Sequence, residues 1–216
     1  MQKIIVFLGP SLDRDSAEKI LSADYRPPAR RGDILKAVRD GATIICLIDG
    51  VFHQESAVAH REILAAVRKG VRVIGASSMG ALRAAEMDTL GMIGIGEIYR
   101  MYRSGELVSD DEVALVFDPV SGYSLSEPLI NIRFTLKKAE SKKIISAADK
   151  DALLAAAKSV FYPQRTYSRI AVAAGKVLTD LVRDDFIAWV EDNACDQKRE
   201  DAIMALEYIA ALVVDS

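Results

Sequence analysis

The chain has 216 residues, of which 50% are hydrophobic and 27% charged, with a formal net charge of −3 at pH 7. This length suits one domain with a sizeable core, or one domain with a helical extension. The slightly acidic balance and the lack of a basic run disfavour nucleic acid as a main partner, because phosphate contacts need clustered Lys and Arg side chains.

The few cysteines and histidines argue against a metal site. Cys46 and Cys195 have no zinc-ligand spacing, and the chain has two histidines. Cys46 lies in an apolar stretch and Cys195 among acidic residues, so we expect neither to be an activated thiol. The N-terminus has no signal-peptide pattern, and no apolar run approaches the roughly 18 residues of a membrane helix. We therefore expect a cytoplasmic protein without metal, cofactor or membrane.

Three continuous apolar segments predict strands, at residues 3–8, 43–48 and 71–74. Helical patterns alternate with them, at residues 13–22, 33–40, 56–69 and 79–89, and a further helix follows Gly96. Strands that are buried on both faces and alternate with helices indicate a parallel sheet between layers of helices. Residues 113–117 are apolar enough for an edge strand. From Ser126 onward only helices are predicted, the first with Ser126 as its cap and Pro128 in its first turn.

The predicted fold class is therefore α/β, with an N-terminal parallel sheet and flanking helices in Rossmann or flavodoxin-like layers, plus a C-terminal helical extension. We place an α/β core domain at residues 1–125 and a helical region packed on it at residues 126–216. In such sheets ligands bind beyond the carboxyl ends of the strands. Residues 9–11, 49–50 and 75–80 follow the three strands and should meet at this edge.

The segment from Val71 to Glu86 carries the most specific pattern. It predicts a strand, a sharp turn and a helix, and it resembles the nucleophile elbow G-x-S-x-G with Ala76 in the first glycine position and Ser78 as the nucleophile. The free N–H groups of a helix start also favour an anion. The turn therefore predicts either a nucleophile or an anion site. The plainer alternative is a turn of small residues that exists for close packing.

A nucleophilic serine needs a base, and His53 and His60 are the two histidines. We predict Ser78 as nucleophile, His60 as base and Asp49 as the group that orients it. The predicted oxyanion and substrate-binding residues are Gly9, Pro10, Ser11, Ser77, Met79, Gly80, Asn131 and Arg133. Ser77 as a helix cap, His60 as a surface residue, and Asn131 and Arg133 in surface ion pairs are the alternatives.

Six segments in this order resemble the TfuA-like protein family, over roughly residues 3–135. They are residues 7–12, 27–34, 47–52, 60–64, 75–86 and 125–133. The resemblance implies that the protein is a partner of a YcaO-type enzyme in peptide backbone thioamidation, as in the biosynthesis of ribosomal peptide natural products. It also implies that the chain releases sulfide by hydrolysing the thiocarboxylate of a ubiquitin-like sulfur-carrier protein, and meets the peptide substrate indirectly.

The same residues are also compatible with two other functions. One is a non-catalytic scaffold that docks the sulfur carrier on the YcaO-type enzyme. The other is a phosphate- or nucleotide-binding module at residues 77–80, although no lysine follows Gly80 as it would in a P-loop.

Overall fold

The computed structural model describes residues 2–52, 56–118 and 124–214. They form two compact units, of which the first joins Met1–Asp110 to Lys198–Ser216 and the second is Asp111–Gln197. This division differs from the one that we expected at residue 125. The last helix belongs to the first unit, although residues 126–216 were expected to form one helical region.

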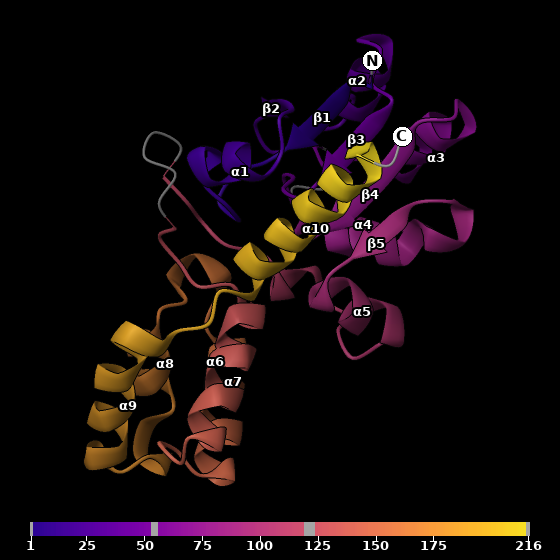
Figure 1. The fold of residues 1–216 in the computed structure, drawn as a ribbon. Coiled ribbons are helices and arrows are strands. Elements are labelled where there is room, and N and C mark those ends of the chain that lie inside the picture. The colour runs from indigo at the N-terminus through magenta and orange to yellow at the C-terminus, as the bar shows by residue number, and fades with distance from the viewer. Residues whose placement is uncertain (1, 53–55, 119–123, 215–216) are drawn as a thin grey trace. The chain divides into compact units, whose positions relative to one another are not determined.

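The first unit is built on a five-stranded sheet in which every strand pair is parallel (Figure 1). The strand order is β2-β1-β3-β4-β5, as in flavodoxin-like folds, which confirms the predicted α/β class. The strands are β1 (Ile4–Phe7), β2 (Asp24–Arg26), β3 (Ile44–Leu47), β4 (Arg72–Ala76) and β5 (Ile93–Ile95). The two edge strands, β2 and β5, each have three residues and were not among the predicted strands.

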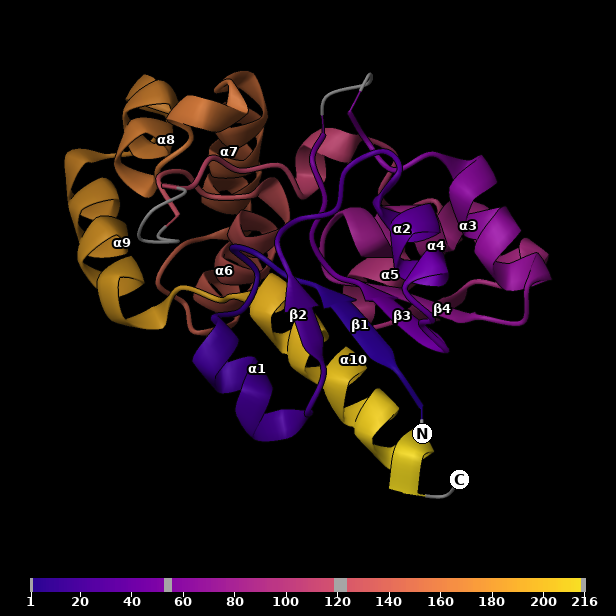
Figure 2. The same cartoon turned by 90° about the horizontal axis from the view of Figure 1, so that it is seen from above.

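Helices cover both faces of this sheet (Figure 2). Ile4 and Val6 of β1 pack in a core cluster with residues of α1 and α10, whereas Ile5 and Phe7 pack with residues of α2, α3 and α4. Burial on both faces explains why the strands read as continuous apolar runs. The helices of this unit are α1 (Arg14–Ile20), α2 (Asp33–Arg39), α3 (His60–Arg68), α4 (Met79–Met87), α5 (Glu97–Ser104) and α10 (Gln197–Val214), with the 3-10 turn η1 (Asp88–Leu90).

The second unit is helical and has its own core. Leu136, Leu153, Ile170 and Phe186 belong to one buried cluster, to which every long helix of the unit contributes. These helices are α6 (Leu129–Ser141), α7 (Ala147–Ser159), α8 (Tyr167–Ala173) and α9 (Asp180–Asn193); the 3-10 turns are η3 (Tyr162–Gln164) and η4 (Gly175–Val177), with η2 (Asp110–Glu112) at the unit's start. No helix within the described ranges is long and apolar enough to cross a membrane.

Two local predictions near the start of the second unit are wrong. Residues 113–117 form no strand, and Phe117 makes a single antiparallel bridge with Ser124. The apolar character of this run reflects burial of Val113 rather than pairing in a sheet. Helix α6 has Pro128 at its N-cap position, and the Ser126 hydroxyl instead accepts a 2.9 Å hydrogen bond from the backbone N–H of Val116.

Candidate functional site

The turn between β4 and α4 is strained at Ser77. This residue follows the strand with φ +65°, and the N–H of Ser78 donates to the carbonyl of Ala76 over 2.8 Å. An i to i+2 hydrogen bond around a residue of positive φ marks a rare and strained γ-turn. The sharp strand-to-helix turn expected from the sequence is therefore present. Its strained residue is Ser77, and Ser78 takes the N-cap position of α4.

Gly80 allows α4 to lie directly against the sheet. A Cβ atom at Gly80 would stand 1.7 Å from the carbonyl oxygen of Leu47, and one at Gly75 would stand 2.2 Å from the oxygen of Gly80. The N–H of Gly80 donates to the carbonyl of Ile48 over 3.2 Å. These small residues therefore serve close packing, and the Gly80 N–H is already used within the fold.

The two serines of the turn differ in their hydrogen bonds. Ser77 is fully buried, and its hydroxyl donates to the carbonyl of Lys198, in the first turn of α10, over 2.8 Å. Within the described part of the chain, the Ser78 hydroxyl makes no hydrogen bond, and neither does the N–H of Met79. The Ser78 hydroxyl and the Met79 N–H are therefore the groups of this turn that keep hydrogen-bonding capacity, in residues that are 1% and 2% exposed.

Asp49 holds the loop that follows β1. One carboxylate oxygen of the buried Asp49 accepts from the N–H of Gly9 at 2.8 Å and of Ser11 at 3.1 Å. The other accepts from the Ser11 hydroxyl at 2.7 Å, and Pro10 between them has no N–H. The donors of this loop, which an oxyanion site would need, therefore bind Asp49 instead. It does so between β1 and β3, where the strand order reverses.

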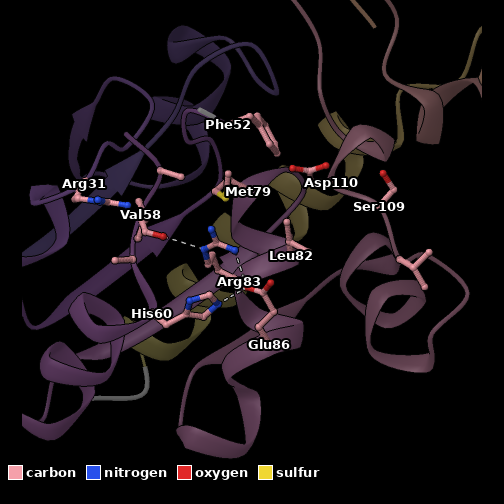
Figure 3. Close-up of a pocket in the computed structure, with 13 residues that line it drawn as sticks. Arg31, Phe52, Val58, His60, Met79, Leu82, Arg83, Glu86, Ser109 and Asp110 are labelled. Carbon is pink, nitrogen blue, oxygen red and sulfur yellow. Dashed lines mark hydrogen bonds and ion pairs between the residues drawn. The ribbon is translucent and has the colours of Figure 1, made fainter. Parts of the chain in front are cut away.

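His60 pairs with a carboxylate that the sequence analysis did not single out (Figure 3). His60 is the first residue of α3, its side chain is 53% exposed, and its Nε2 lies 2.7 Å from Oε2 of Glu86. Arg83 donates to the same oxygen through Nη1 at 2.6 Å and to the carbonyl of Val58 through Nε at 2.9 Å. The i, i+3 spacing of Arg83 and Glu86 on the helix after the turn was the available signal.

The structure does not bring His60 to Ser78. Glu86 follows Ser78 by eight positions along α4, which corresponds to about 12 Å along the helix axis. Among the described residues His60 bonds Glu86, whereas Asp49 bonds Gly9 and Ser11. His53 lies outside the described residues.

A pocket of about 670 Å³ lies along α4 in the first unit. Four residues of α4 on one helical face line it: Met79, Leu82, Arg83 and Glu86. His60 of α3 and the side chains of Phe52 and Val108 are also part of its lining. Because Met79 directly follows Ser78, the pocket begins beside the β4–α4 turn and extends to His60 and Glu86.

Asn131 and Arg133 have partners in the second unit. The Asn131 side-chain amide donates to Asp196 at 3.0 Å. Arg133 makes a two-point ion pair with the buried carboxylate of Glu112, at 2.8 and 2.6 Å. Arg133 is therefore in an ion pair, the alternative to a substrate-binding role.

The Cys46 thiol and a metal site are two further candidates for chemistry, and the described residues support neither. Full burial raises the pKa of the Cys46 thiol to about 12, which keeps the thiol neutral. Within the described ranges, no three His, Cys, Asp or Glu side chains form a group that could hold a metal ion.

Comparison with known proteins assigns the chain to a family. No curated protein matches the chain. The model of the family described as TfuA-like protein matches residues 49–166, which is more than half of the chain and includes Asp49, His60 and the β4–α4 turn. The chain belongs to the TfuA-like protein family.

Proposed function

We propose that this protein is an accessory component of YcaO-dependent peptide backbone thioamidation, and that it releases sulfide by hydrolysing the thiocarboxylated C-terminus of a ubiquitin-like sulfur carrier. Membership of the TfuA-like family supports a role in YcaO systems. The observation that carries the hydrolysis is the Ser78 hydroxyl, which has no hydrogen bond within the described residues and stands beside the unpaired N–H of Met79.

The proposed reaction is an acyl transfer through Ser78. The serine oxygen attacks the thiocarboxyl carbon, the carbon–sulfur bond breaks, and sulfur leaves as hydrosulfide with the bonding electron pair and the serine proton. The Met79 N–H donates to the oxyanion, which the N-terminus of α4 also favours. Water then cleaves the acyl ester and one proton is released, so that one thiocarboxylate and one water give one carboxylate, one hydrosulfide, one proton and the free serine.

The proposal changes the role of the loop at residues 9–11 and keeps His60 and Asp49 as predictions. Gly9, Pro10 and Ser11 shape the rim through Asp49, rather than binding the oxyanion themselves. His60 as the base for Ser78 stays a prediction, and it requires the imidazole to leave Glu86. Asp49 as the group that orients the base likewise stays a prediction.

Sulfide release from a thiocarboxylated carrier protein tests the proposal. Ser78→Ala should lower the rate at least about 100-fold, because loss of a nucleophile removes the covalent route. Ser104→Ala is the matched control, since this hydroxyl bonds the carbonyl of Met101 within α5, and its rate should equal that of the wild type. Unchanged release by Ser78→Ala would refute hydrolysis through this residue. Carrier binding without any release by the wild type would favour the scaffold alternative.

Titration with ATP separates this proposal from a nucleotide-binding module. We expect no binding heat, because Gly80 donates its N–H to Ile48 and no lysine follows it. Saturable binding of ATP would favour the nucleotide alternative.

A further inference from the structure

In the pocket along α4, Arg83 and Glu86 each keep one side-chain atom available for a ligand. The guanidinium of Arg83 is fixed by its bonds to Val58 and Glu86, and its side chain is 13% exposed. Its second terminal nitrogen, Nη2, makes no hydrogen bond with the described residues. Glu86 accepts both of its bonds at Oε2, so Oε1 is likewise without a partner there. Figure 3 shows this guanidinium between Val58 and Glu86.

This pair suits a peptide main chain better than an anion. Each peptide residue brings one carbonyl acceptor and one N–H donor, which match Arg83 Nη2 and Glu86 Oε1. The two side chains form an ion pair 2.6 Å long, so an added phosphate would meet the negative charge of Glu86 beside the positive charge of Arg83. The remaining lining combines apolar side chains, among them Phe52, Leu82 and Val108, with the charged side chains of Arg31 and Asp110.

The length of the pocket also fits the end of a chain. From Met79 to Glu86 the helix advances by about 10 Å, which three residues of extended peptide cover. A peptide whose last carbon lies at Ser78 would therefore pass Leu82 and place its main chain beside Arg83 and Glu86 about three residues earlier. Ala57 and Ala59 are also part of the lining.

We infer that this pocket binds the last residues of an extended peptide, with Arg83 Nη2 donating to a main-chain carbonyl and Glu86 Oε1 accepting from a main-chain N–H. The inference rests on the proposed function, because it makes the carrier's C-terminal tail the occupant. It moves recognition of that tail from Asn131 and Arg133, which are paired within the second unit, to α4.

Fluorescence anisotropy with a labelled eight-residue peptide that ends in Gly-Gly and a free carboxylate tests the inference on the full chain. The wild type should bind the peptide saturably. Leu82→Trp, which fills the pocket, and Arg83→Met, which removes the donor, should each weaken binding at least about tenfold. Arg14→Met removes an equal charge from an exposed ion pair on α1 and should leave the affinity unchanged.

Each outcome decides for or against the pocket. Wild-type affinity in Leu82→Trp overturns the inference, and so does a lack of saturable binding at millimolar peptide or binding of inorganic phosphate in its place. Melting temperatures of the variants show whether Arg83→Met also disturbs the fold, and Leu82→Trp keeps all hydrogen bonds of Arg83. Because the peptide contains no sulfur, its binding is independent of sulfide release. The experiments can therefore refute hydrolysis through Ser78 and still support peptide binding by the pocket, or refute peptide binding and still support hydrolysis.

Discussion

At the scale of single residues, two neighbouring serines have opposite roles. Ser77 has the strained backbone, and its hydroxyl donates a hydrogen bond to the carbonyl of Lys198. Ser78 has a negative φ, and its hydroxyl makes no hydrogen bond with the described residues. The strained residue therefore builds the turn, and the next residue is the candidate nucleophile.

Substitution of Ser77 should separate its hydrogen bond from its backbone strain. Ser77→Ala loses the bond to Lys198 and keeps the positive φ, so we expect a loss of about 1–3 kcal/mol in the free energy of unfolding. Ser77→Gly loses the same bond but relieves roughly 1 kcal/mol of strain, and should be the more stable variant. Urea unfolding of both proteins measures the difference. Equal stability of Ser77→Ala and wild type would contradict the structural role.

Glu127, in the second unit, should make stability depend on pH. Burial raises the pKa of its carboxyl group, and the charge of Asp196 raises it further. The folded state therefore holds this proton more strongly than the unfolded state, so the stabilisation is complete below the unfolded pKa and is lost as pH rises through the folded pKa. Glu127→Gln should unfold at higher urea than the wild type at pH 7 and show no such advantage at pH 3. A constant difference across this range would contradict the assignment.

At the scale of elements, Gly80 sets the distance between α4 and β3. Gly80→Ala should cost about 3 kcal/mol or more, since its Cβ would overlap the backbone carbonyl of Leu47. Gly41→Ala is the control, because Gly41 precedes β3, has φ +87° and has open space around a Cβ atom. We expect this control to cost about 1 kcal/mol. Urea midpoints decide the order, and a smaller loss in Gly80→Ala than in Gly41→Ala would contradict this packing.

The sequence predicted what depends on local pattern, and missed what depends on contacts between distant segments. The central strands and the turn at Ser78 could be predicted, because continuous apolar runs and a small-residue turn mark them locally. The pairing of His60 with Glu86 could not, because it depends on how α3 and α4 meet in the fold. The clamp of Asp49 on Ser11 joins residues 38 positions apart, and nothing local distinguishes it from a free carboxylate.

At the scale of the whole molecule, the last helix completes the first unit. Figure 1 shows α10 beside the strands, and Ala202, Ala205, Leu206 and Ile209 are all fully buried in the core cluster that contains Val6. The buried Asp201 also accepts hydrogen bonds from the N–H groups of Glu97 and Ile98, which caps α5. A helical pattern alone does not show which sheet face a helix covers. The sequence therefore predicted that α10 belongs with the helices that precede it in the chain.

Removal of residues 198–216 should therefore unfold the sheet as well as shorten the chain. It exposes the apolar face that α10 covers, leaves the Ser77 hydroxyl without its acceptor and uncaps α5. We expect the shortened chain to lose cooperative thermal unfolding and the dispersed amide resonances of a folded α/β unit, and residues 198–216 added as a separate peptide should restore both. A chain that ends at Val213 is the control, since Val214 is 86% exposed and its loss should change neither measurement. A cooperative transition in the chain without residues 198–216 would show that the sheet is stable without α10.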